Sequence, residues 1–324
     1  MDLTVLKNLD VAVVHEASLS DFTTFRLGGK CPLLFACQTP GQLISTVQFC
    51  FRENIQFILI GSGSNLVVSD LGIDCSVIRY ESDKPLIERE GNDLVVSGST
   101  LLDDLVKYAI DNELEGLNGM SGIPGTVGGA VVGNAGAFGK QIGDVVKSVR
   151  TICRDSAKPV FAIVDILARD IPFSYRHSMF KETDAIIVSV RFSLRPSDKL
   201  PLKKEHDEIL ALRREKHPDW RIYPCAGSFF RNVEPTSKAG RREAAGWFLE
   251  QAGAKKLRSG GARVFDRHAN IIYKSQGCRA QDVFDLSRTM ARLVKDKFNI
   301  DLIREVRFVG KFDGMPKKIK SVFW

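Results

Sequence analysis

The segment from Gly116 to Gly139 is the feature of this chain with the clearest chemical meaning. It carries no charge and has glycine at nearly every third position. Each glycine inside a helix costs roughly 0.5–1 kcal/mol relative to alanine, so we expect no helix in this run. Its polar residues exclude a membrane span, and its few repeats exclude collagen. We expect a backbone that approaches a ligand closely and donates its own N–H groups, as binding of a phosphate-bearing cofactor or nucleotide requires.

A second glycine-rich segment lies between two predicted strands and reads Gly61, Ser62, Gly63, Ser64, Asn65. It lacks the dinucleotide fingerprint G-x-G-x-x-G, because a leucine and then a strand follow, and we therefore expect no Rossmann domain. Alone, the segment is equally compatible with a glycine hairpin. Together with part of the long glycine run, it predicts two arms of one pyrophosphate cradle, with N–H groups and hydroxyls as donors. The residues of the second arm are Gly125, Thr126, Gly128, Gly129, Asn134 and Gly136.

Two polar segments contain side chains suited to catalysis. Arg176 lies in a run that reads SYRHS, and a guanidinium fork can bind both oxygens of a substrate carboxylate. Taken alone, that run is most simply a surface loop. Ser228 follows Ala-Gly and precedes two phenylalanines. Because no G-x-S-x-G elbow is present, a hydrolase nucleophile is excluded, and a serine at a strand edge is the simpler explanation.

Three further positions also have simple structural explanations. Glu305 falls in a run that alternates as a strand does, where it would share a face with Arg307 and form an ion pair. Lys216 stands at the expected end of a charged helix. His268, taken alone, is typical of a hydrogen-bonded structural histidine.

Composition limits the class of protein. The 324 residues are 44% apolar and carry a net charge of +7, which indicates two or three domains and favours an anionic ligand. The basic residues are dispersed, which argues against nucleic-acid binding; only the tail from 311 to 324 is locally basic. Seven cysteines without a C-x-x-C motif indicate reduced thiols in the cytoplasm, and five scattered histidines predict no metal. The acidic N-terminal segment is unlike a signal peptide, and we expect no membrane insertion.

The pattern of apolar residues, caps and turns predicts an α+β protein rather than a regular parallel βαβ series. Helices are expected at 39–54, from Ser99 or Thr100 to 112, and at 204–216, 242–252 and 279–298. Strands are expected at 57–60, 66–68, 76–79, 94–96, 145–153, 160–164, 185–194, 262–265, 271–273 and 305–309, with a strand or turn at 227–232. Boundaries near 80 and 200 divide the chain into units at 1–80, 81–200 and 201–310, followed by the tail.

Taken together, these motifs resemble those of the UDP-N-acetylenolpyruvoylglucosamine reductases, flavoenzymes that make UDP-N-acetylmuramate for peptidoglycan. The resemblance covers nearly the whole chain and most closely the shorter subtype, which lacks an extra tyrosine-bearing loop. The matching segments are TTFRLGG at 23–29, GSGSN at 61–65, GIPGTVGG at 122–129, NAG at 134–136, YRHS at 175–178, AGSFF at 226–230, EQAG at 250–253, GGA at 260–262 and EVRFVG at 305–310. Two departures are Lys274, where asparagine is common, and Cys31-Pro32, where Pro-Ala is usual.

The resemblance implies FAD in a fold of the vanillyl-alcohol-oxidase type, with a C-terminal substrate domain. It gives Ser228 the role of proton donor to the reaction intermediate, and Arg176 and Glu305 the role of stabilising that intermediate. Contacts to UDP-N-acetylglucosamine enolpyruvate or NADPH fall on Tyr175, Lys216, Asn232 and, less securely by motif, His268. The cradle would bind FAD non-covalently, since 61–65 and 122–136 contain no histidine or cysteine. A monomer is expected.

Two alternatives stay open at the level of sequence. One is a flavin oxidase of the same fold, which would use oxygen and an alcohol and often holds FAD covalently. The other is a UDP-sugar-binding module without catalysis, although Arg176, Ser228 and Glu305 are all retained. With no second nucleotide-binding fold visible, NADPH and substrate would use one cleft in turn, which predicts ping-pong kinetics.

Overall fold

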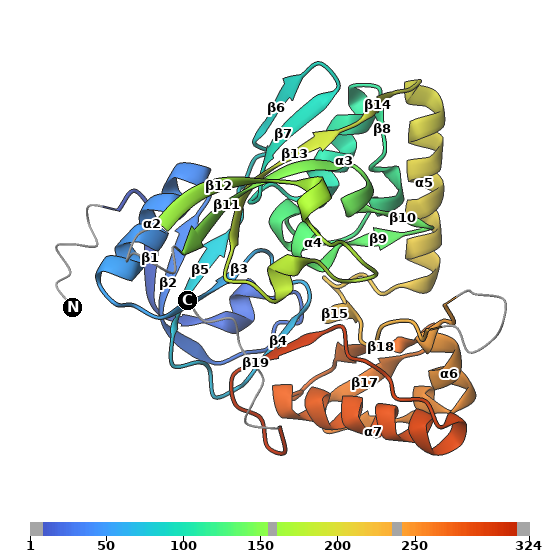
Figure 1. Cartoon of the computed structure of the whole chain (residues 1–324). Coiled ribbons are helices and arrows are strands. Elements are labelled where there is room, and N and C mark those ends of the chain that lie inside the picture. Colours follow the sequence, from blue (N-terminus) through green and yellow to red (C-terminus); the bar gives the residue numbers. More distant parts are fainter. Residues whose placement is uncertain (1–8, 155–160, 235–241, 316–324) are drawn as a thin grey trace.

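The computed structural model describes residues 9–154, 161–234 and 242–315, which form three packed units (Figure 1). The first unit is built on a four-stranded sheet in the order β1-β2-β5-β3, in which β1 runs antiparallel to β2 and the other neighbours are parallel. A capping box between Thr39 and Gln42 starts helix α2, as the sequence predicts. The elements are β1 (Ala12–Ser18), β2 (Lys30–Cys37), α2 (Pro40–Arg52), β3 (Phe57–Ile60) and β5 (Ser76–Tyr80).

The second unit contains a five-stranded antiparallel sheet in the order β12-β11-β13-β7-β6, with helices α3 and α4 packed against it and α5 against α3 (Figure 1). Two short antiparallel pairs complete it, the hairpin of β9 with β10 and the pairing of β8 with the distant β14. The elements are β6 (Ile87–Glu90), β7 (Asp93–Ser97), α3 (Leu102–Asp111), β8 (Leu114–Glu115), α4 (Val127–Gly133), β9 (Gly136–Ala137), β10 (Lys140–Gln141), β11 (Val146–Arg154), β12 (Phe161–Leu167), β13 (Ile186–Ser193), β14 (Arg195–Pro196) and α5 (Lys199–Lys216).

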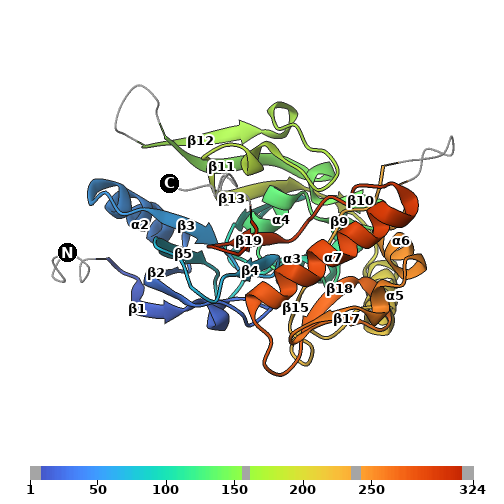
Figure 2. The same ribbon diagram turned by 90° about the horizontal axis from the view of Figure 1, so that it is seen from below.

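The third unit has a four-stranded sheet in the order β15-β18-β17-β16, with helix α6 against β18 and the long helix α7 across its lower face (Figure 2). It is tied to the first unit by β19, which pairs in parallel with β4. The elements are β15 (Cys225–Ser228), α6 (Ala245–Gln251), β16 (Arg258–Ser259), β17 (Ala262–Phe265), β18 (His268–Lys274), α7 (Ala280–Phe298) and β19 (Arg307–Val309). Strand β4 (Leu66–Val68) belongs to the first unit.

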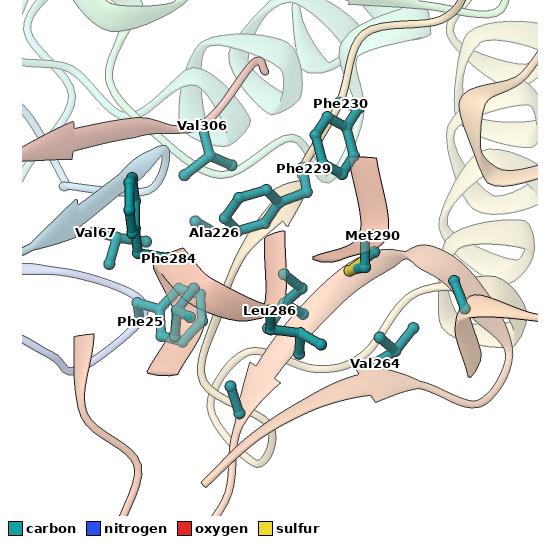
Figure 3. Close-up of a cluster of buried hydrophobic side chains, with 14 of the residues drawn as sticks. Phe25, Val67, Ala226, Phe229, Phe230, Val264, Phe284, Leu286, Met290 and Val306 are labelled. Carbon is teal, nitrogen blue, oxygen red and sulfur yellow. The ribbon is translucent and has the colours of Figure 1, made fainter. Parts of the chain in front are cut away.

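The core of the third unit includes residues from the first. Phe25 and Val67 are buried among Phe229, Phe284 and other apolar side chains of the third unit (Figure 3). Burying an aromatic or branched side chain contributes roughly 1.5–3 kcal/mol, so these contacts stabilise the junction as well as the core. The N-terminal motif at 23–29 therefore has a packing role that its distance in sequence does not reveal.

The glycine run contains a helix, so the expectation of no helix there is wrong for α4. Thr126 caps the helix by accepting a hydrogen bond from the Gly129 N–H at 3.3 Å, and Asn134 ends it in the left-handed region at φ +43°. Val127 and Val131 are fully buried. Tertiary burial and good capping therefore offset the conformational entropy that the glycines lose.

Three other boundaries differ from expectation. Helix α3 has Leu101 at its N-cap rather than Ser99 or Thr100. Helix α5 begins at Lys199, earlier than expected, and its Leu202 is buried in the core of the second unit. Strand β19 begins at Arg307, so Glu305 precedes the strand and does not share a strand face with Arg307. The remaining predicted elements are present within a few residues of their expected limits, and residues 316–324 of the basic tail lie outside the described residues.

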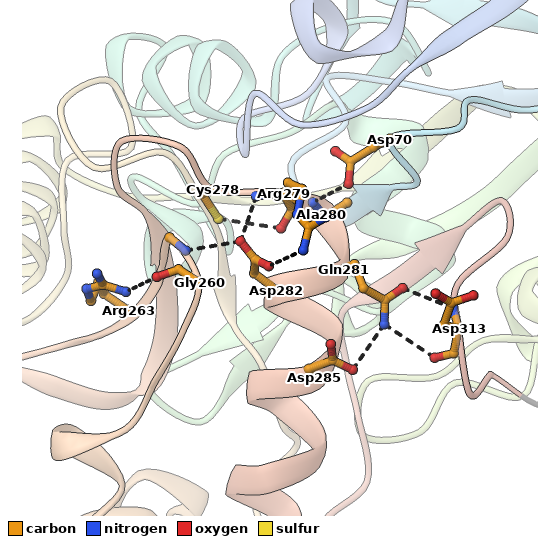
Figure 4. Close-up of polar contacts among 11 residues, drawn as sticks. Asp70, Gly260, Arg263, Cys278, Arg279, Ala280, Gln281, Asp282, Asp285 and Asp313 are labelled. Carbon is orange, nitrogen blue, oxygen red and sulfur yellow. Dashed lines mark hydrogen bonds and ion pairs between the residues drawn. The ribbon is translucent and has the colours of Figure 1, made fainter.

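Helix α7 is anchored at its N-terminus by two carboxylates (Figure 4). Asp282 Oδ2 accepts hydrogen bonds from the N–H groups of Arg279 and Gly261, both at 3.0 Å. Asp70, from the first unit, accepts from the Ala280 N–H at 2.8 Å. Burial raises the pKa of Asp282, but these N–H groups and the Arg279 guanidinium outweigh it, so that the net pKa lies below its ordinary value.

We expect Asp282→Ala to lower the free energy of unfolding at pH 7 by about 1–2 kcal/mol, because it removes an N-terminal cap. The folded-state pKa of Asp282 is depressed, so its stabilisation is present above the unfolded pKa of about 3.9 and is lost as the pH falls through the folded value. Denaturant unfolding at pH 7 and pH 3 measures both effects. Asp296→Ala, at an exposed position of the same helix, is the control. A difference from wild type that does not shrink in acid would contradict this assignment.

Candidate active site

The two predicted arms of the cradle lie side by side. Segment 61–65 follows β3, and Thr126 stands at the start of α4. A Cβ atom on Gly61 would overlap Thr126 Oγ1 and lie 2.9 Å from its Cγ2. The hydroxyl of Ser64 donates to the Pro124 carbonyl at 3.0 Å, which fixes the second contact between the arms. Glycine at position 61 is therefore required by this close approach.

The first arm has donors that the protein does not use. The backbone N–H groups of Ser62, Gly63 and Ser64 make no hydrogen bond to another described residue. Ser62 Oγ is buried and is likewise without a partner among the described residues. Gly63 has φ +61°, and a Cβ there would overlap the Phe22 carbonyl. Consecutive unpaired N–H groups beside an unpaired hydroxyl form a concavity that suits phosphate oxygens.

Four residues of the second arm make hydrogen bonds or close contacts within the protein. The Gly128 N–H donates to the Gly98 carbonyl at 2.9 Å, and the Gly129 N–H donates to the cap hydroxyl. The buried amide of Asn134 bonds Gln141, the Ser174 carbonyl and the Gly143 N–H. Gly136 pairs with β10, where a Cβ would overlap backbone. The expectation that the N–H groups of Gly128 and Gly129 are left for a ligand is not met, and these four positions shape the cradle.

Arg176 and Glu305, far apart in sequence, form a direct ion pair. Arg176 Nε lies 3.0 Å from Glu305 Oε1, and their side chains are only 25% and 20% exposed. Arg176 has φ +55°, in a tight turn where Ser174 and His177 exchange two backbone hydrogen bonds. Its guanidinium carbon lies 5.1 Å from the centre of the Tyr175 ring. The printed contact of this pair is made by Nε of Arg176.

Glu305 is the carboxylate of a cluster rich in cations. Burial raises its pKa, while Arg176, Lys181 and Arg231 act in the opposite direction. Lys181 in turn is close enough to Arg307 to be affected by its charge. Three cations therefore act on one carboxylate in a partly buried site, and a fourth, Arg307, acts on Lys181. Such an excess of positive charge favours a ligand that brings a further negative group.

Ser228 is positioned beside Glu305 by the backbone. It ends β15 after Gly227, which has φ +73°. The next carbonyl, that of Phe229, accepts from the Glu305 N–H at 2.9 Å. The Glu305 carbonyl accepts from the Asn65 side chain at 3.2 Å, which connects this site to the cradle. Ser228 Oγ makes no hydrogen bond to another described residue, so its proton is available.

Two positioning residues of this site were not predicted from the sequence. Asn270 is 2% exposed, and its side chain donates to the Phe230 carbonyl at 2.8 Å and accepts from the Phe230 N–H at 2.9 Å. It thereby holds the segment that follows Ser228. Thr24 donates to the Cys225 carbonyl at 2.8 Å. The sequence signal that could have identified Asn270 is an amide side chain between Ala269 and Ile271 in a buried strand.

The predicted substrate contacts form two groups. Tyr175 and Asn232 are in contact, since the Asn232 N–H donates to the Tyr175 hydroxyl at 3.3 Å. Arg242 covers the Tyr175 ring, with its guanidinium carbon 4.4 Å from the ring centre. Lys216 is exposed at the end of α5, and its charge acts on His268.

His268 packs against a second histidine that the sequence analysis did not select. The ring centres of His268 and His217 are 5.1 Å apart. Burial lowers the pKa of His217 to about 4, with the neighbouring His268, Arg213 and Lys216 adding to the effect. Burial also lowers the pKa of His268. Both rings are therefore neutral at pH 7 and can donate or accept hydrogen bonds beside Lys216.

Comparison with known proteins agrees with this geometry. Residues 32–157 match an FAD binding domain, so the chain is an α+β flavoprotein with the predicted class of FAD-binding fold. Residues 217–309 match the C-terminal domain of UDP-N-acetylenolpyruvoylglucosamine reductase. The enzyme of that name from Lactobacillus acidophilus is 33% identical, with 96% of this chain and 99% of the relative covered. The one from Carboxydothermus hydrogenoformans is 34% identical, covering 94% and 96%.

A solved structure gives the same result. The crystal structure of UDP-N-acetylenolpyruvylglucosamine reductase from Thermus caldophilus matches with a TM-score of 0.73 and 28% identity, covering 93% of this chain and 99% of that chain. The chain belongs to the UDP-N-acetylenolpyruvoylglucosamine reductase family. The family resemblance read from the motifs is confirmed.

Three further features concern membrane-spanning helices, metal ligands and cysteines. Within 9–154, 161–234 and 242–315, no helix is both long and apolar enough to cross a membrane. Over the same ranges, no three histidine, cysteine or acidic side chains gather as they would around a metal ion. All seven cysteines are free thiols.

We expect Gly61→Ala to reduce the flavin content of the purified protein several-fold, because the added Cβ forces the two arms of the cradle apart. The ratio of flavin to protein absorbance measures this. Gly133→Ala is the matched control, since Gly133 lies in the same glycine run but has open space around its Cβ position. The control should keep its flavin and gain at most roughly 0.5–1 kcal/mol of stability, since Gly133 is the last residue of α4. Full flavin content in Gly61→Ala would contradict the assignment of the cradle.

Proposed function

We propose that this protein is an FAD-dependent reductase that converts UDP-N-acetylglucosamine enolpyruvate to UDP-N-acetylmuramate, with NADPH as the reductant, in peptidoglycan precursor synthesis. The observation that carries the proposal is the partly buried Arg176–Glu305 pair at 3.0 Å, whose Glu305 N–H bonds the carbonyl of Phe229, the residue after Ser228. The Ser228 hydroxyl makes no hydrogen bond to another described residue. An anion-binding group and a proton donor beside a phosphate cradle suit reduction of an anionic enol ether.

The residues of the cradle fit the pyrophosphate of FAD. The N–H groups of Ser62, Gly63 and Ser64 and the hydroxyl of Ser62 supply donors that have no partner among the described residues. Neither 61–65 nor 122–136 contains a histidine or cysteine, so binding there is non-covalent. When bound, FAD supplies the hydride that reduces the substrate, while the protein supplies position and electrostatics.

Arg176 binds the substrate carboxylate and stabilises the negative charge that develops next to it during reduction. Its Nε is held by Glu305, which leaves the two terminal nitrogens to form a bidentate pair with the carboxylate. A preorganised cation in a site shielded from water stabilises such charge by several kcal/mol, roughly 3–4 for a single donor in other enzymes. Glu305 keeps the guanidinium in place, and the positive charges of Arg176, Lys181 and Arg231 oppose the rise in its pKa that burial causes.

Ser228 delivers the proton that completes the reduction. A serine hydroxyl is a weak acid, but a carbanionic intermediate is basic enough to take its proton when the two lie within hydrogen-bond distance. Tyr175, Asn232, Lys216 and His268 bind the nucleotide and sugar parts of the substrate or of NADPH. One site serves both, so that NADPH leaves before the substrate enters. The protein acts as a monomer in the cytoplasm.

The test is to follow the two half-reactions separately with the flavin-loaded protein. NADPH should bleach the flavin in the absence of substrate, and the enolpyruvyl substrate should restore its absorbance without oxygen. Double-reciprocal plots should give parallel lines. Intersecting lines would show that both ligands are bound at once and would overturn the single-site proposal. Reduced flavin that oxygen reoxidises but the substrate does not would overturn the proposed reaction in favour of an oxidase.

We expect Ser228→Ala to leave flavin reduction by NADPH within about twofold of wild type. Reoxidation by the substrate should slow by at least roughly a hundredfold, the lower range of general-acid effects. Stopped-flow absorbance of each half-reaction makes the measurement. Ser259→Ala, on the opposite edge strand of the same sheet, is the control and should change neither rate. Equal slowing of both half-reactions would argue against Ser228 as the acid.

A further inference from the structure

Lys181 is a partly buried cation to which the proposed chemistry gives no role of its own. It ends a short 3₁₀ helix (Met179–Lys181) that follows the Arg176 turn. The base of this helix is fixed, since the Ser178 hydroxyl donates to the Val132 carbonyl on α4 at 2.9 Å. The Lys181 ammonium folds back and donates to the main-chain carbonyl of Arg176 at 2.7 Å. This hydrogen bond spans five residues and restrains the backbone at Arg176.

The backbone at Arg176 needs such support. Its φ of +55° lies in the left-handed region, which is disfavoured for residues with a side chain and persists only where the surroundings enforce it. The paired hydrogen bonds between Ser174 and His177 close the turn. The bond from Lys181 fixes the peptide that follows Arg176. Together they determine where the guanidinium points relative to Glu305.

Lys181 also takes part in the electrostatics of the cluster. The charged groups around it are Arg176 in the turn, Arg231 beyond β15, and Glu305 and Arg307 at the start of β19. Burial and the three arginines lower the pKa of Lys181 to about 8, while Glu305 acts in the opposite direction. The same ammonium lowers the pKa of Glu305. Removing it would therefore favour the protonated form of Glu305, which binds Arg176 less well.

We propose that Lys181 is a positioning residue for substrate reduction, which fixes the main chain of Arg176 so that the guanidinium is aimed at the substrate carboxylate. This inference rests on the proposed function. Lys181 acts through Arg176 and Glu305 and need not touch the substrate itself. Its effect should therefore appear in the half-reaction that involves the carboxylate, and not in reduction of the flavin by NADPH.

The test compares Lys181→Met, which removes the donor and the charge, with Lys181→Arg, which keeps both. Lys147→Met is the control, because Lys147 makes an exposed ion pair with Asp93 away from the cluster. Flavin-loaded proteins are used throughout. In Lys181→Met, reoxidation by the substrate should slow at least tenfold while reduction by NADPH stays within twofold. Lys181→Arg should recover most of the rate, and the control should match wild type.

Two measurements separate positioning from a general loss of structure. In Lys181→Met the acidic limb of the reoxidation rate should move to higher pH, because Glu305 loses a neighbouring positive charge and its pKa rises. Calorimetry should show that the oxidised protein binds the enolpyruvyl substrate at least several-fold more weakly, while the melting temperature is unchanged. Lys181→Gln, which keeps a donor without the charge, provides the same comparison if Lys181→Met does not retain flavin.

The outcomes distinguish this inference from the proposed function. Wild-type protein that fails to couple NADPH oxidation to substrate reduction would overturn the proposed function itself. If the wild type is active, then equal slowing of both half-reactions, an acidic limb that does not move, or a Lys181→Arg variant as slow as Lys181→Met would each overturn the role of Lys181 alone.

Discussion

The active site depends on one backbone hydrogen bond, from the Glu305 N–H to the Phe229 carbonyl at 2.9 Å. It joins the segment that follows Ser228 to the segment before β19, and so brings the backbone at Ser228 close to the backbone at Glu305. Asn65 bonds the Glu305 carbonyl from the cradle, and Asn270 holds Phe230 from behind. Because these are main-chain and buried amide contacts, they position the catalytic side chains without using them.

Around this junction positive side chains outnumber negative ones. One carboxylate, Glu305, faces several cations in a partly buried cluster, and burial raises its pKa. A buried charge without compensation is unfavourable, so the cluster is most stable when an anion completes it. The Arg176–Glu305 pair thus has two roles: it neutralises part of the excess and it orients the guanidinium. Binding and catalysis then draw on the same electrostatic field.

Glycine performs different tasks in the two arms of the cradle. Gly61 lies against the Thr126 side chain and Gly63 against the Phe22 carbonyl, approaches that a Cβ would prevent. Within the described part of the chain, the N–H groups of Ser62, Gly63 and Ser64 in the first arm are unpaired. Gly128 and Gly129 lie within α4 and donate to protein groups. The second arm therefore acts as a rigid wall, held by Thr126 and Asn134, against which the donor-rich arm is placed. A similar glycine content in two segments does not imply a similar contact to the ligand.

The sequence by itself determined the family and most of the elements, although not β1 and β2, because capping residues, apolar periodicity and short motifs are local signals. It also selected Ser228, Arg176 and Glu305 as candidate site residues. It could not show that α4 forms within the glycine run, since burial of Val127 and Val131 outweighs local propensity. Nor could it show the ion pair between Arg176 and Glu305. The hydrogen bonds from Asn270 to the Phe230 backbone and from Lys181 to the Arg176 carbonyl were also beyond it. These depend on which distant segments pack together, and that is decided only when the hydrophobic cores form and bring the three units into contact.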